Sequence, residues 1–397
     1  MIRTGVELGL AELRRTLRRA WSSAATLVVL SMLTLTLAGL ADALERDSTG
    51  VLRSLDADVV VFNEEARLQL LRSRVPAPLG VSLGWLEGVA RAGTIGLFPT
   101  SLATGSEQTR ITIVGYNART PAEPTNVVAG RLPVDGEPRI AAADVRLRSR
   151  GLELGDTVVL AGDREVEIVG FVEDTLFLQQ PTVWVPPHLW AEVRASAFPE
   201  AGFAEMLAGA TVVRTAVGAD PAEVAATIEA ELADLDADDV ALDDVDDLDG
   251  FAVDAVAMPR ALDAIPGVDV QRNTFTVIVA LAVAVVGVVV GLLFTLLVSE
   301  RRPVLATLRA LGAPPKVLVT ALLTQVVALW AVATVGGTAV TLVLAEVVPE
   351  AMPLAVRPGL VAWIAVALLA ASVAGAAFAL RRVARLDPAV VMQEDPE

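Results

Sequence analysis

The chain has 397 residues, of which 54% are hydrophobic, and its mean hydropathy of +0.58 is too high for a soluble globular protein. It contains no cysteine and one histidine, His188, so disulfides, thiolate metal sites and multi-histidine metal sites are excluded. The net charge of −17 argues against nucleic acid as a partner, and most of the acidic residues lie between Asp42 and Arg272.

Four runs without a charged residue predict four transmembrane α-helices. The runs cover residues 20–41, 274–298, 317–345 and 358–380, and each has at least the roughly 20 residues needed to cross a bilayer. The first run could instead belong to a signal peptide, because Ala41-Asp42-Ala43 resembles a cleavage site. It is longer than a usual signal core, however, so we expect a multi-pass membrane protein.

Basic residues flank these runs on one side only. A predicted amphipathic helix over residues 1–19 ends in arginines, the loop 299–316 is basic, and the tail 381–397 begins with arginines. Such clusters mark the cytoplasmic side of a membrane, so both termini and this loop are expected in the cytoplasm. The region 42–272 and the loop 346–357 are then extracytoplasmic. The expected location is the plasma (cytoplasmic) membrane.

The region 42–272 mixes strand and helix patterns, which predicts a large extracytoplasmic α+β domain with two lobes. One lobe is expected from about 55–120 together with 203–270, and the other is a β-rich inserted subdomain over 125–195. Strands are expected at 57–62, 93–98, 110–116, 155–160, 165–172, 182–185 and 210–215. Helices are expected at 68–73, 84–92, 139–148 and 221–232.

Residues 231–254 carry eleven acids, and the spacing of Asp234, Asp236 and Asp238 is one that calcium loops use. The glycine and the glutamate that an EF-hand needs at its sixth and twelfth positions are missing. A solvated acidic loop is therefore the favoured interpretation, and no metal site is predicted.

Small residues at helical spacing occur in two of the predicted spans. Gly287 and Gly291 form a GxxxG motif in the second span, and Ala371 and Gly375 form a similar pair in the fourth. Small side chains let two helices approach closely, so these four residues are candidates for helix packing.

The stretch 299–316, between the second and third spans, predicts a short capped helix. Ser299 is a candidate N-cap, Pro303 fits the first turn, and Gly312 fits the C-terminal end. Helical spacing aligns four apolar side chains into one stripe: Val304, Leu305, Leu308 and Leu311. Such a helix could bind a soluble partner, whereas a solvated turn that only sets topology is the alternative.

The segments Glu300-Arg301-Arg302 and Leu308-Arg309-Ala310-Leu311-Gly312 lie between these two spans. They resemble the cytoplasmic loop of the MacB/FtsX-type ABC transporter permeases, which docks on the ATPase subunit. The resemblance implies ATPase contacts for Glu300, Arg301, Arg302, Val304, Leu305, Leu308, Arg309, Leu311 and Gly312. The chain departs from the family at Val304, where an acidic residue is usual, and at Pro314 and Pro315, where polar or basic residues are usual.

The same resemblance implies a MacB-like extracytoplasmic domain and a homodimer that pairs with two ATPase subunits. The chain itself lacks the Walker A motif, which ends in Gly-Lys followed by Ser or Thr, because its single lysine, Lys316, is followed by Val317. We therefore expect no enzyme activity and no bound cofactor in this chain. ATP and Mg²⁺ would bind to the partner ATPase.

A closer likeness concerns the cargo. The segments 37–44, 56–62 and 73–75 resemble the DevC/HrtB-like branch of the family, whose members include haem exporters. This implies haem or another amphipathic molecule, such as a drug, peptide or lipid, as cargo. Near the first span, Met32 and Glu45 are the candidate cargo contacts, although a core methionine and a solvated acid are the ordinary interpretations.

Three functions remain open at this point. The first is the permease subunit of an ABC-type efflux system, in which ATP hydrolysis moves the extracytoplasmic domain and drives transport. The second is a relay of the same shape that regulates an extracytoplasmic cell-wall hydrolase. The third is a membrane-anchored sensor without an ATPase, which the capped basic stretch disfavours.

Overall fold

The computed structural model describes residues 17–104, 107–197, 207–233, 252–300, 315–347, 354 and 356–384. The chain divides into two compact units. The first, called here the helix bundle, comprises residues 1–43 and 272–397, and the second, called the extracytoplasmic domain, comprises residues 44–271.

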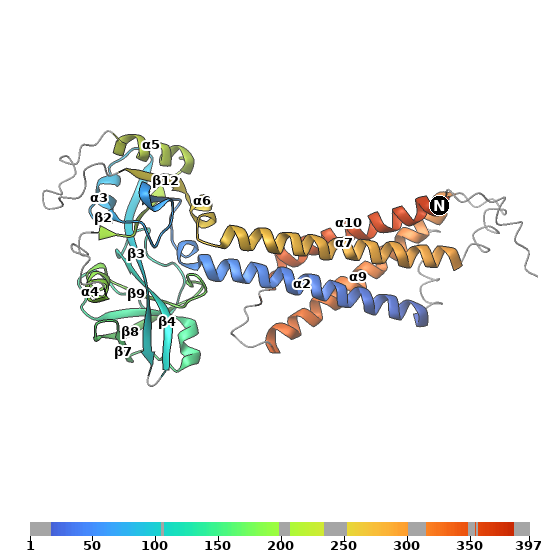
Figure 1. The fold of residues 1–397 in the computed structure, drawn as a ribbon, viewed down its shortest axis with the longest axis horizontal. Helices are drawn as coiled ribbons and strands as arrows, with labels where there is room; N and C mark the ends of the chain where they lie inside the picture. Colours follow the sequence, from blue (N-terminus) through green and yellow to red (C-terminus); the bar gives the residue numbers. More distant parts are fainter. Residues whose placement is uncertain are drawn as a thin grey trace, which may run out of the picture. The chain divides into compact units, whose positions relative to one another are not determined.

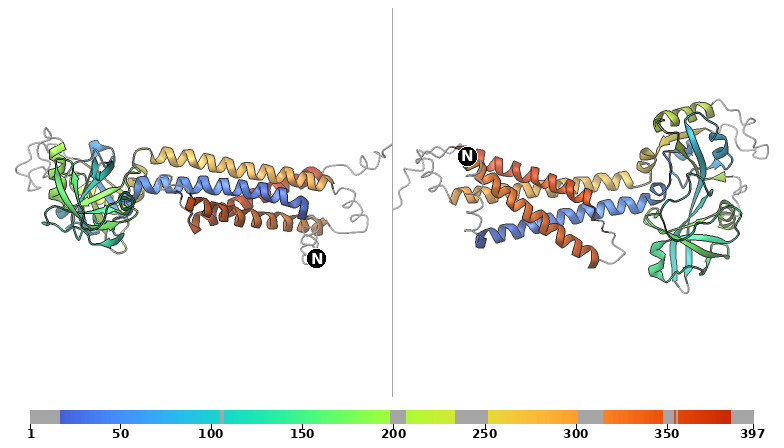
Figure 2. Two further views of the ribbon diagram at one scale, coloured as in Figure 1. Left: turned by 90° about the horizontal axis from the view of Figure 1, so that it is seen from below. Right: turned by 180° about the vertical axis from the view of Figure 1, so that it is seen from behind.

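Four long helices are present in the described part of the chain, and they lie side by side in both views of Figure 2. They are α2 (Leu17–Arg53), α7 (Val268–Glu300), α9 (Pro315–Val347) and α10 (Pro358–Ala384). Each is long and apolar enough to span a membrane, so the prediction of four transmembrane helices is confirmed. Helix α2 continues beyond the first apolar run, and α7 begins before the second, because both extend into polar sequence.

The helix bundle has a buried centre and an apolar outer surface. Phe294 on α7, Val326 on α9 and Leu368 on α10 are at most 4% exposed and belong to one cluster with residues of α2. Val277 and Trp363, by contrast, are 67% and 65% exposed. In water such a surface would be unfavourable, and it fits a surface that contacts lipid.

One mixed sheet of ten strands forms the extracytoplasmic domain within the described residues (Figure 1). Its strands follow the order β12-β1-β11-β3-β4-β9-β6-β8-β5, and β7 pairs with both β3 and β8. The pairs β4–β9 and β6–β8 are parallel and the others are antiparallel. The strand bounds are β1 Val59–Asn63, β3 Val89–Thr104, β4 Glu107–Tyr116, β5 Val127–Gly130, β6 Ile140–Asp144, β7 Thr157–Leu160, β8 Arg164–Val172, β9 Thr182–Val185, β11 Ala210–Thr215 and β12 Val253–Ala257.

Shorter elements cover and join this sheet. Figure 1 shows α4 (Pro187–Ala197) and α5 (Pro221–Ala233) over different parts of it. Strands β2 (Val75–Pro76) and β10 (Leu207–Ala208) pair in a separate small ribbon. The remaining elements are the helices α3 (Leu79–Leu83) and α6 (Met258–Asp263) and the 3-10 turns Glu64–Ala66 and Val145–Arg150.

The β-rich lobe of the domain is a set of paired strands that closes on itself. Strands β3, β4, β9, β6, β8 and β7 return to β3, and their inward side chains, such as Ile113, Ile168 and Val183, are fully buried. This set is called the ring core. The long hairpin β3–β4 carries the sheet from the ring to strands β11, β1 and β12, so the two lobes share strands and are not separate sheets.

Alternation along each strand sends side chains to two faces, because successive residues of a strand point to opposite sides. On β1, Val59 and Val61 face a core under α3 and α5, called the α5 core. Val60 and Phe62 face a second core, called the shared core, which continues across the sheet to Trp184 of the ring lobe. One face of the domain is thus continuous, and the opposite face is divided between the α5 core and the ring core.

Three predicted helices are wrong. Residues 68–73 form turns because Arg67 and Leu68 adopt positive φ angles of 51° and 60°, which an α-helix cannot contain. Residues 84–92 contain Gly88, whose φ of 83° breaks the pattern before β3 begins. Residues 139–148 begin instead with strand β6, whose buried alanines lie between two neighbouring strands. Their helix propensity is outweighed by this tertiary pairing.

Candidate functional site

The predicted coupling segment, residues 299–316, is described only at its ends. Glu300 is the last residue of α7, and Pro315 begins α9. The candidates Arg301, Arg302, Val304, Leu305, Leu308, Arg309, Leu311 and Gly312 lie outside the described residues. The Ser299 hydroxyl donates to the Leu296 carbonyl at 2.8 Å inside the last turn of α7, so its predicted role as an N-cap is wrong.

The C-terminal turns of α2 are built into the extracytoplasmic domain. The loop of residues 174–180 lies against them, and together with residues 47–51 of α2 it is called here the helix–loop junction. Its backbone is joined to the helix by three hydrogen bonds: Val51 N to Leu176 O at 3.2 Å, Leu178 N to Ser48 O at 3.2 Å, and Gln179 N to Asp47 O at 2.9 Å. Main-chain bonds of this kind fix the loop to the helix whatever its side chains are.

Gly50 allows this close contact. A Cβ atom at Gly50 would lie 2.7 Å from the Asp174 carbonyl oxygen and 2.7 Å from both the nitrogen and the oxygen of Leu176. These three atoms are backbone and cannot move aside as a flexible side chain can. Glycine inside a helix costs about 1 kcal/mol relative to alanine, so its presence here is explained by the loop.

An ion pair reinforces the junction. The Arg146 guanidinium donates to both carboxylate oxygens of Asp47, at 2.8 Å and 2.9 Å, and the Asp47 side chain is only 10% exposed. Two parallel, charge-assisted hydrogen bonds hold both position and orientation. Asp47 lies near the end of α2 and Arg146 lies two residues after the end of β6, so the pair ties the helix to the ring lobe.

A buried chain of hydrogen bonds supports Arg146 and the loop from inside. Trp184 Nε1 donates to the Thr182 hydroxyl at 2.9 Å, Thr182 donates to Thr175 at 2.8 Å, and Thr175 donates to Asp144 Oδ2 at 2.8 Å. The other carboxylate oxygen of Asp144 accepts from the backbone N–H of Arg146 at 2.9 Å. Burial raises the pKa of Asp144, and these hydrogen bonds act in the opposite direction.

The first residues of α7 join the same region of the domain. Val268 at its start and Ile265 just before it belong to the shared core, which also contains Val51 and Leu52 from the end of α2 and Leu55, two residues beyond that end. All five are at most 8% exposed. The extracytoplasmic ends of both helices are therefore packed into one hydrophobic core.

Within the helix bundle, the four predicted packing residues lie together. A Cβ atom at Gly287 would lie 3.1 Å from the Ala371 carbonyl oxygen, and one at Gly291 would lie 3.2 Å from that of Gly375. A Cβ at Gly375 would overlap the Gly287 carbonyl oxygen. The structure thus brings Gly287, Gly291, Ala371 and Gly375 into one contact between α7 and α10 of the same chain.

A second close contact joins α2 and α9. A Cβ atom at Gly337 would lie 2.7 Å from the Ser31 hydroxyl oxygen and 2.9 Å from the Met32 backbone nitrogen, and Gly336 faces Val28. The adjacent pair Gly336-Gly337 is the sequence signal for this contact, and neither glycine is among the predicted packing residues. Helices α9 and α10 are joined by a hydrogen bond from Trp330 Nε1 to the Ala365 carbonyl at 2.8 Å.

Replacing Gly375 by valine is expected to separate α7 from α10. The added side chain meets backbone atoms of Gly287 and Gly291, and overpacking of this kind costs about 1–3 kcal/mol. Thermal unfolding of the purified chain in detergent should occur at a clearly lower temperature. Gly359→Val, also on α10 but with no atom within 4 Å of its Cβ among the described residues, is the matched control and should unfold like the wild type. Equal loss in both variants would show that the α7–α10 contact is not responsible.

Models of two known protein families match the sequence of this chain. The model of the MacB-like periplasmic core domain matches residues 22–231, which is more than half of the chain. The model of the FtsX-like permease C-terminal region matches residues 276–388.

The chain belongs to the MacB/FtsX-type permease family.

Solved structures similar to the extracytoplasmic part of this permease have low sequence identity. The periplasmic region of MacB from Actinobacillus actinomycetemcomitans is 12% identical with a TM-score of 0.36, and the match covers 53% of the permease and 92% of that chain. The extracellular domain of the noncanonic ABC-type transporter YknZ from Gram-positive bacteria is 18% identical with a TM-score of 0.32, covering 44% and 94%. A domain of a putative permease protein from Porphyromonas gingivalis is 15% identical with a TM-score of 0.32, covering 51% and 90%. No curated protein matches the sequence.

Membership of this family has three consequences. The permease is a transmembrane component of an ABC-type system, and members of the family work with ABC ATPases as partners. It is a multi-pass membrane protein. Its domain of residues 44–271 is extracytoplasmic, since the MacB-like periplasmic model covers most of it.

The two candidate cargo contacts of the permease do not form one iron site within the chain. Met32 and Glu45 lie thirteen residues apart on helix α2, which corresponds to about 20 Å at 1.5 Å per residue. Met32 packs with its backbone against Gly337. Among the described residues no group of three His, Cys, Asp or Glu side chains could hold a metal ion.

The helix–loop junction of the permease was not predicted from sequence. Its partners are far apart in the chain, as Asp47 with Arg146 and Gly50 with Leu176 illustrate. One local signal exists, because Gly50 interrupts an otherwise helical segment where alanine would be more stable.

Proposed function

We propose that this permease couples ATP hydrolysis by a separate ATPase subunit to movement of its extracytoplasmic domain, and thereby to export of an amphipathic cargo. Haem, a drug, a peptide or a lipid would each fit this class. In this proposal the ATPase binds the coupling segment, residues 299–316, and the complex contains two copies of each subunit. The plasma membrane is the proposed location, with both termini in the cytoplasm.

One observation carries the proposal. The end of α2 and the start of α7 pack into the shared core, and α2 is also held by the Asp47–Arg146 ion pair. The end of α2 is fixed in the extracytoplasmic domain by these contacts, so a displacement of residues 47–52 would displace the domain with them. A flexible linker of glycine and serine would not transmit such movement.

The proposed orientation can be tested with single cysteines, because the chain has no native cysteine. Val217, which is fully exposed on the extracytoplasmic domain, and Thr307 in the coupling segment are suitable positions. Val217→Cys in intact cells should react with a membrane-impermeant maleimide. Thr307→Cys should react only after permeabilisation. The opposite labelling pattern would contradict the orientation.

Transport itself can be tested with proteoliposomes that contain the permease and the ATPase encoded with it. ATP should drive movement of an amphipathic fluorescent probe or of haem, and an ATPase variant without its catalytic glutamate should abolish this movement. A stable complex that hydrolyses ATP but moves no amphipathic probe would favour the alternative relay to a cell-wall hydrolase. A permease that recovers no ATPase at all would favour the sensor function.

A further inference from the structure

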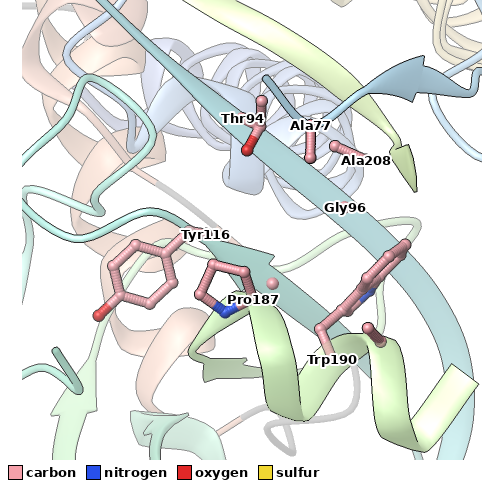
Figure 3. Close-up of a pocket in the computed structure, with 9 residues that line it drawn as sticks. Ala77, Thr94, Gly96, Tyr116, Pro187, Trp190 and Ala208 are labelled. Atoms are coloured by element: carbon pink, nitrogen blue, oxygen red, sulfur yellow. The ribbon is translucent and has the colours of Figure 1, made fainter. Parts of the chain in front are cut away.

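Two hollows lie beside strand β3 in the extracytoplasmic domain. Figure 3 shows the smaller one between Trp190, Ala77 and Ala208, and its volume of about 30 Å³ has room for little more than a water molecule. The larger one, called here the α3 groove, has a volume of about 320 Å³ and is lined by α3, the start of β3 and the chain that follows β4. This volume falls within the range of small-molecule sites.

The pairing of β3 explains why a groove lies there. Strand β4 ends at Tyr116, which pairs with Ile95, so within the described chain residues 89–94 of β3 pair with β11 alone. A Cβ atom at Gly80 of α3 would lie 3.4 Å from the Thr94 side chain. One at Gly93, by contrast, would overlap the Thr120 side chain. Successive residues of a strand point to opposite faces, so α3 and Thr120 lie on opposite faces of β3, with the groove at the edge between them.

The walls of the α3 groove are fixed by internal contacts. Leu79 and Leu83 of α3 are each 1% exposed and belong to the α5 core. On the other side, Asn117 Oδ1 accepts from the Thr94 backbone N–H at 3.1 Å, and the Thr120 hydroxyl donates to the Asn117 carbonyl at 2.8 Å. Because these walls are already ordered, little conformational freedom is lost when a ligand binds.

Apolar side chains are exposed in this groove. Val81 and Trp85 line it and are 72% and 88% exposed. Gly80 and Gly84 also line it, and neither has a side chain that would fill the space. An exposed indole beside an open space provides a stacking surface for a flat apolar group.

Two guanidinium groups line the same groove. Arg91 is paired with Asp56 at 2.9 Å, so its charge is compensated. The Arg119 side chain has no ion pair or hydrogen bond among the residues that the structure describes. Glu123 accepts from the Arg119 backbone N–H at 3.0 Å and not from its guanidinium. In a chain with a net charge of −17, this unpaired positive charge favours an anionic ligand.

The backbone at Arg119 points in the same direction. Its φ angle is 60°, a left-handed conformation that is uncommon for residues other than glycine, asparagine and aspartate. Such conformations occur preferentially at ligand-binding positions.

We propose that the α3 groove binds a small amphipathic carboxylate, with its flat apolar part on Trp85 and Val81 and its carboxylate on Arg119. The guanidinium group presents its N–H donors in a fork that matches both oxygens of a carboxylate. As a statement about cargo this inference rests on the proposed function, and it narrows the amphipathic cargo to one with an acid group.

Binding of naphthylacetate to the full-length permease in lipid nanodiscs tests the proposal, with naphthylethanol as a neutral probe of similar shape. Isothermal titration calorimetry at neutral pH, with empty nanodiscs as the blank, should show saturable binding of one naphthylacetate per chain. Naphthylethanol should bind at least about 10-fold more weakly, because it lacks the charge-assisted hydrogen bonds to Arg119.

Arg119→Gln should remove the preference, so that both probes bind with the lower affinity of naphthylethanol. Trp85→Ala should weaken binding of both probes about 10-fold, because the stacking surface is lost. Both side chains are exposed, so each variant should unfold at the wild-type temperature, which shows that it folds. Arg110→Gln and Val217→Ala remove exposed side chains elsewhere in the domain and should bind naphthylacetate like the wild type.

Equal binding of the two probes by the wild type overturns the proposal, and so does a preference for naphthylacetate that persists in Arg119→Gln. A wild type without saturable binding above the nanodisc blank overturns it as well. If Trp85→Cys is cross-linked to a second copy by a short bismaleimide, the groove is an interface between copies and the proposal is wrong.

The binding measurement requires neither the ATPase nor ATP, so it is independent of the transport measurement. Binding without transport contradicts the proposed function alone, and transport without binding contradicts the proposed groove alone.

Discussion

Leu308→Asp is expected to release the permease from its ATPase while leaving the membrane protein folded. Leu308 lies in the middle of the predicted apolar stripe of the coupling segment, with Val304, Leu305 and Leu311. If the stripe is buried on the ATPase, each large side chain contributes about 1.5–3 kcal/mol. Aspartate removes that contribution and also forces a carboxylate into an apolar contact. We expect at least a roughly 30-fold loss of affinity, since about 2 kcal/mol is typical of a central interface residue.

Co-purification of the ATPase with matched amounts of wild type and variant measures this effect, and ATP-dependent transport should fall in parallel. Ala310→Asp is the control. In the predicted helix two residues correspond to about 200°, so we expect Ala310 on the side opposite Leu308 and expect its replacement to preserve binding. Equal recovery of the ATPase with wild type and Leu308→Asp would show that the stripe does not dock.

Gly50→Val is expected to disrupt the helix–loop junction and to cause the largest loss of stability in the extracytoplasmic domain. Its Cβ would lie 2.7 Å from three backbone atoms of Asp174 and Leu176, and valine adds two further methyl groups there. The loop must move, which breaks its main-chain bonds to α2 and disturbs Thr175 in the middle of the buried hydrogen-bond chain. We expect a loss of at least about 3 kcal/mol, the upper part of the range for overpacked cores.

Two measurements distinguish loss of stability from loss of coupling. Thermal unfolding should shift strongly in Gly50→Val, and transport per ATP hydrolysed should decrease at temperatures where the variant is still folded. Asp47→Asn keeps the shape of the junction but weakens its ion pair, so it should show a smaller change in the same direction. A Gly50→Val protein that unfolds and transports like the wild type would mean that the loop does not lie against α2.

The sequence predicts the four transmembrane helices well because the bilayer imposes a simple requirement. Every backbone group in the hydrocarbon must be paired within the segment, so length and hydropathy alone identify the spans. Hydropathy does not predict where these helices end. Leu44 to Arg53 are polar or mixed, yet they continue α2 because Val51 and Leu52 are buried in the shared core.

Strand prediction succeeds where a strand is flanked by turns and rich in β-branched residues, as for β9 and β11, whose bounds include Val183 and Val212. Strand prediction fails where the conformation is determined by an interaction with residues far away in the sequence. Ala141 to Ala143 have high helix propensity, and only the pairing of β6 with β8 and β9 makes them a strand. Similarly, local spacing identifies Gly287 and Gly375 as small residues, but it does not show that they meet each other.

The candidate site divides in the same way. The coupling segment is predicted from a stripe and charges that are adjacent in sequence, and residues 301–314 of it lie outside the described part of the chain, so it stays a prediction. The helix–loop junction depends on residues far apart in the chain, because α2 meets the loop 174–180 and Arg146 there. No local pattern marks Arg146 as the partner of Asp47, because an exposed surface arginine has the same sequence context.

The position of β1 between β12 and β11 has a consequence for biogenesis. This strand is fully buried from Val59 to Phe62, and its partners are β11 and β12, which appear in the chain only at residues 211–213 and 253–257. During export, the segment Val-Val-Val-Phe therefore crosses the membrane early and waits without partners for most of the domain to follow. Unpaired apolar strands of this kind are prone to aggregate. The last partner, β12, is followed by the short helix α6 and then by α7, so the sheet can be completed only when the chain has been made almost up to α7. Chains that stop before residue 253 are therefore expected to be degraded.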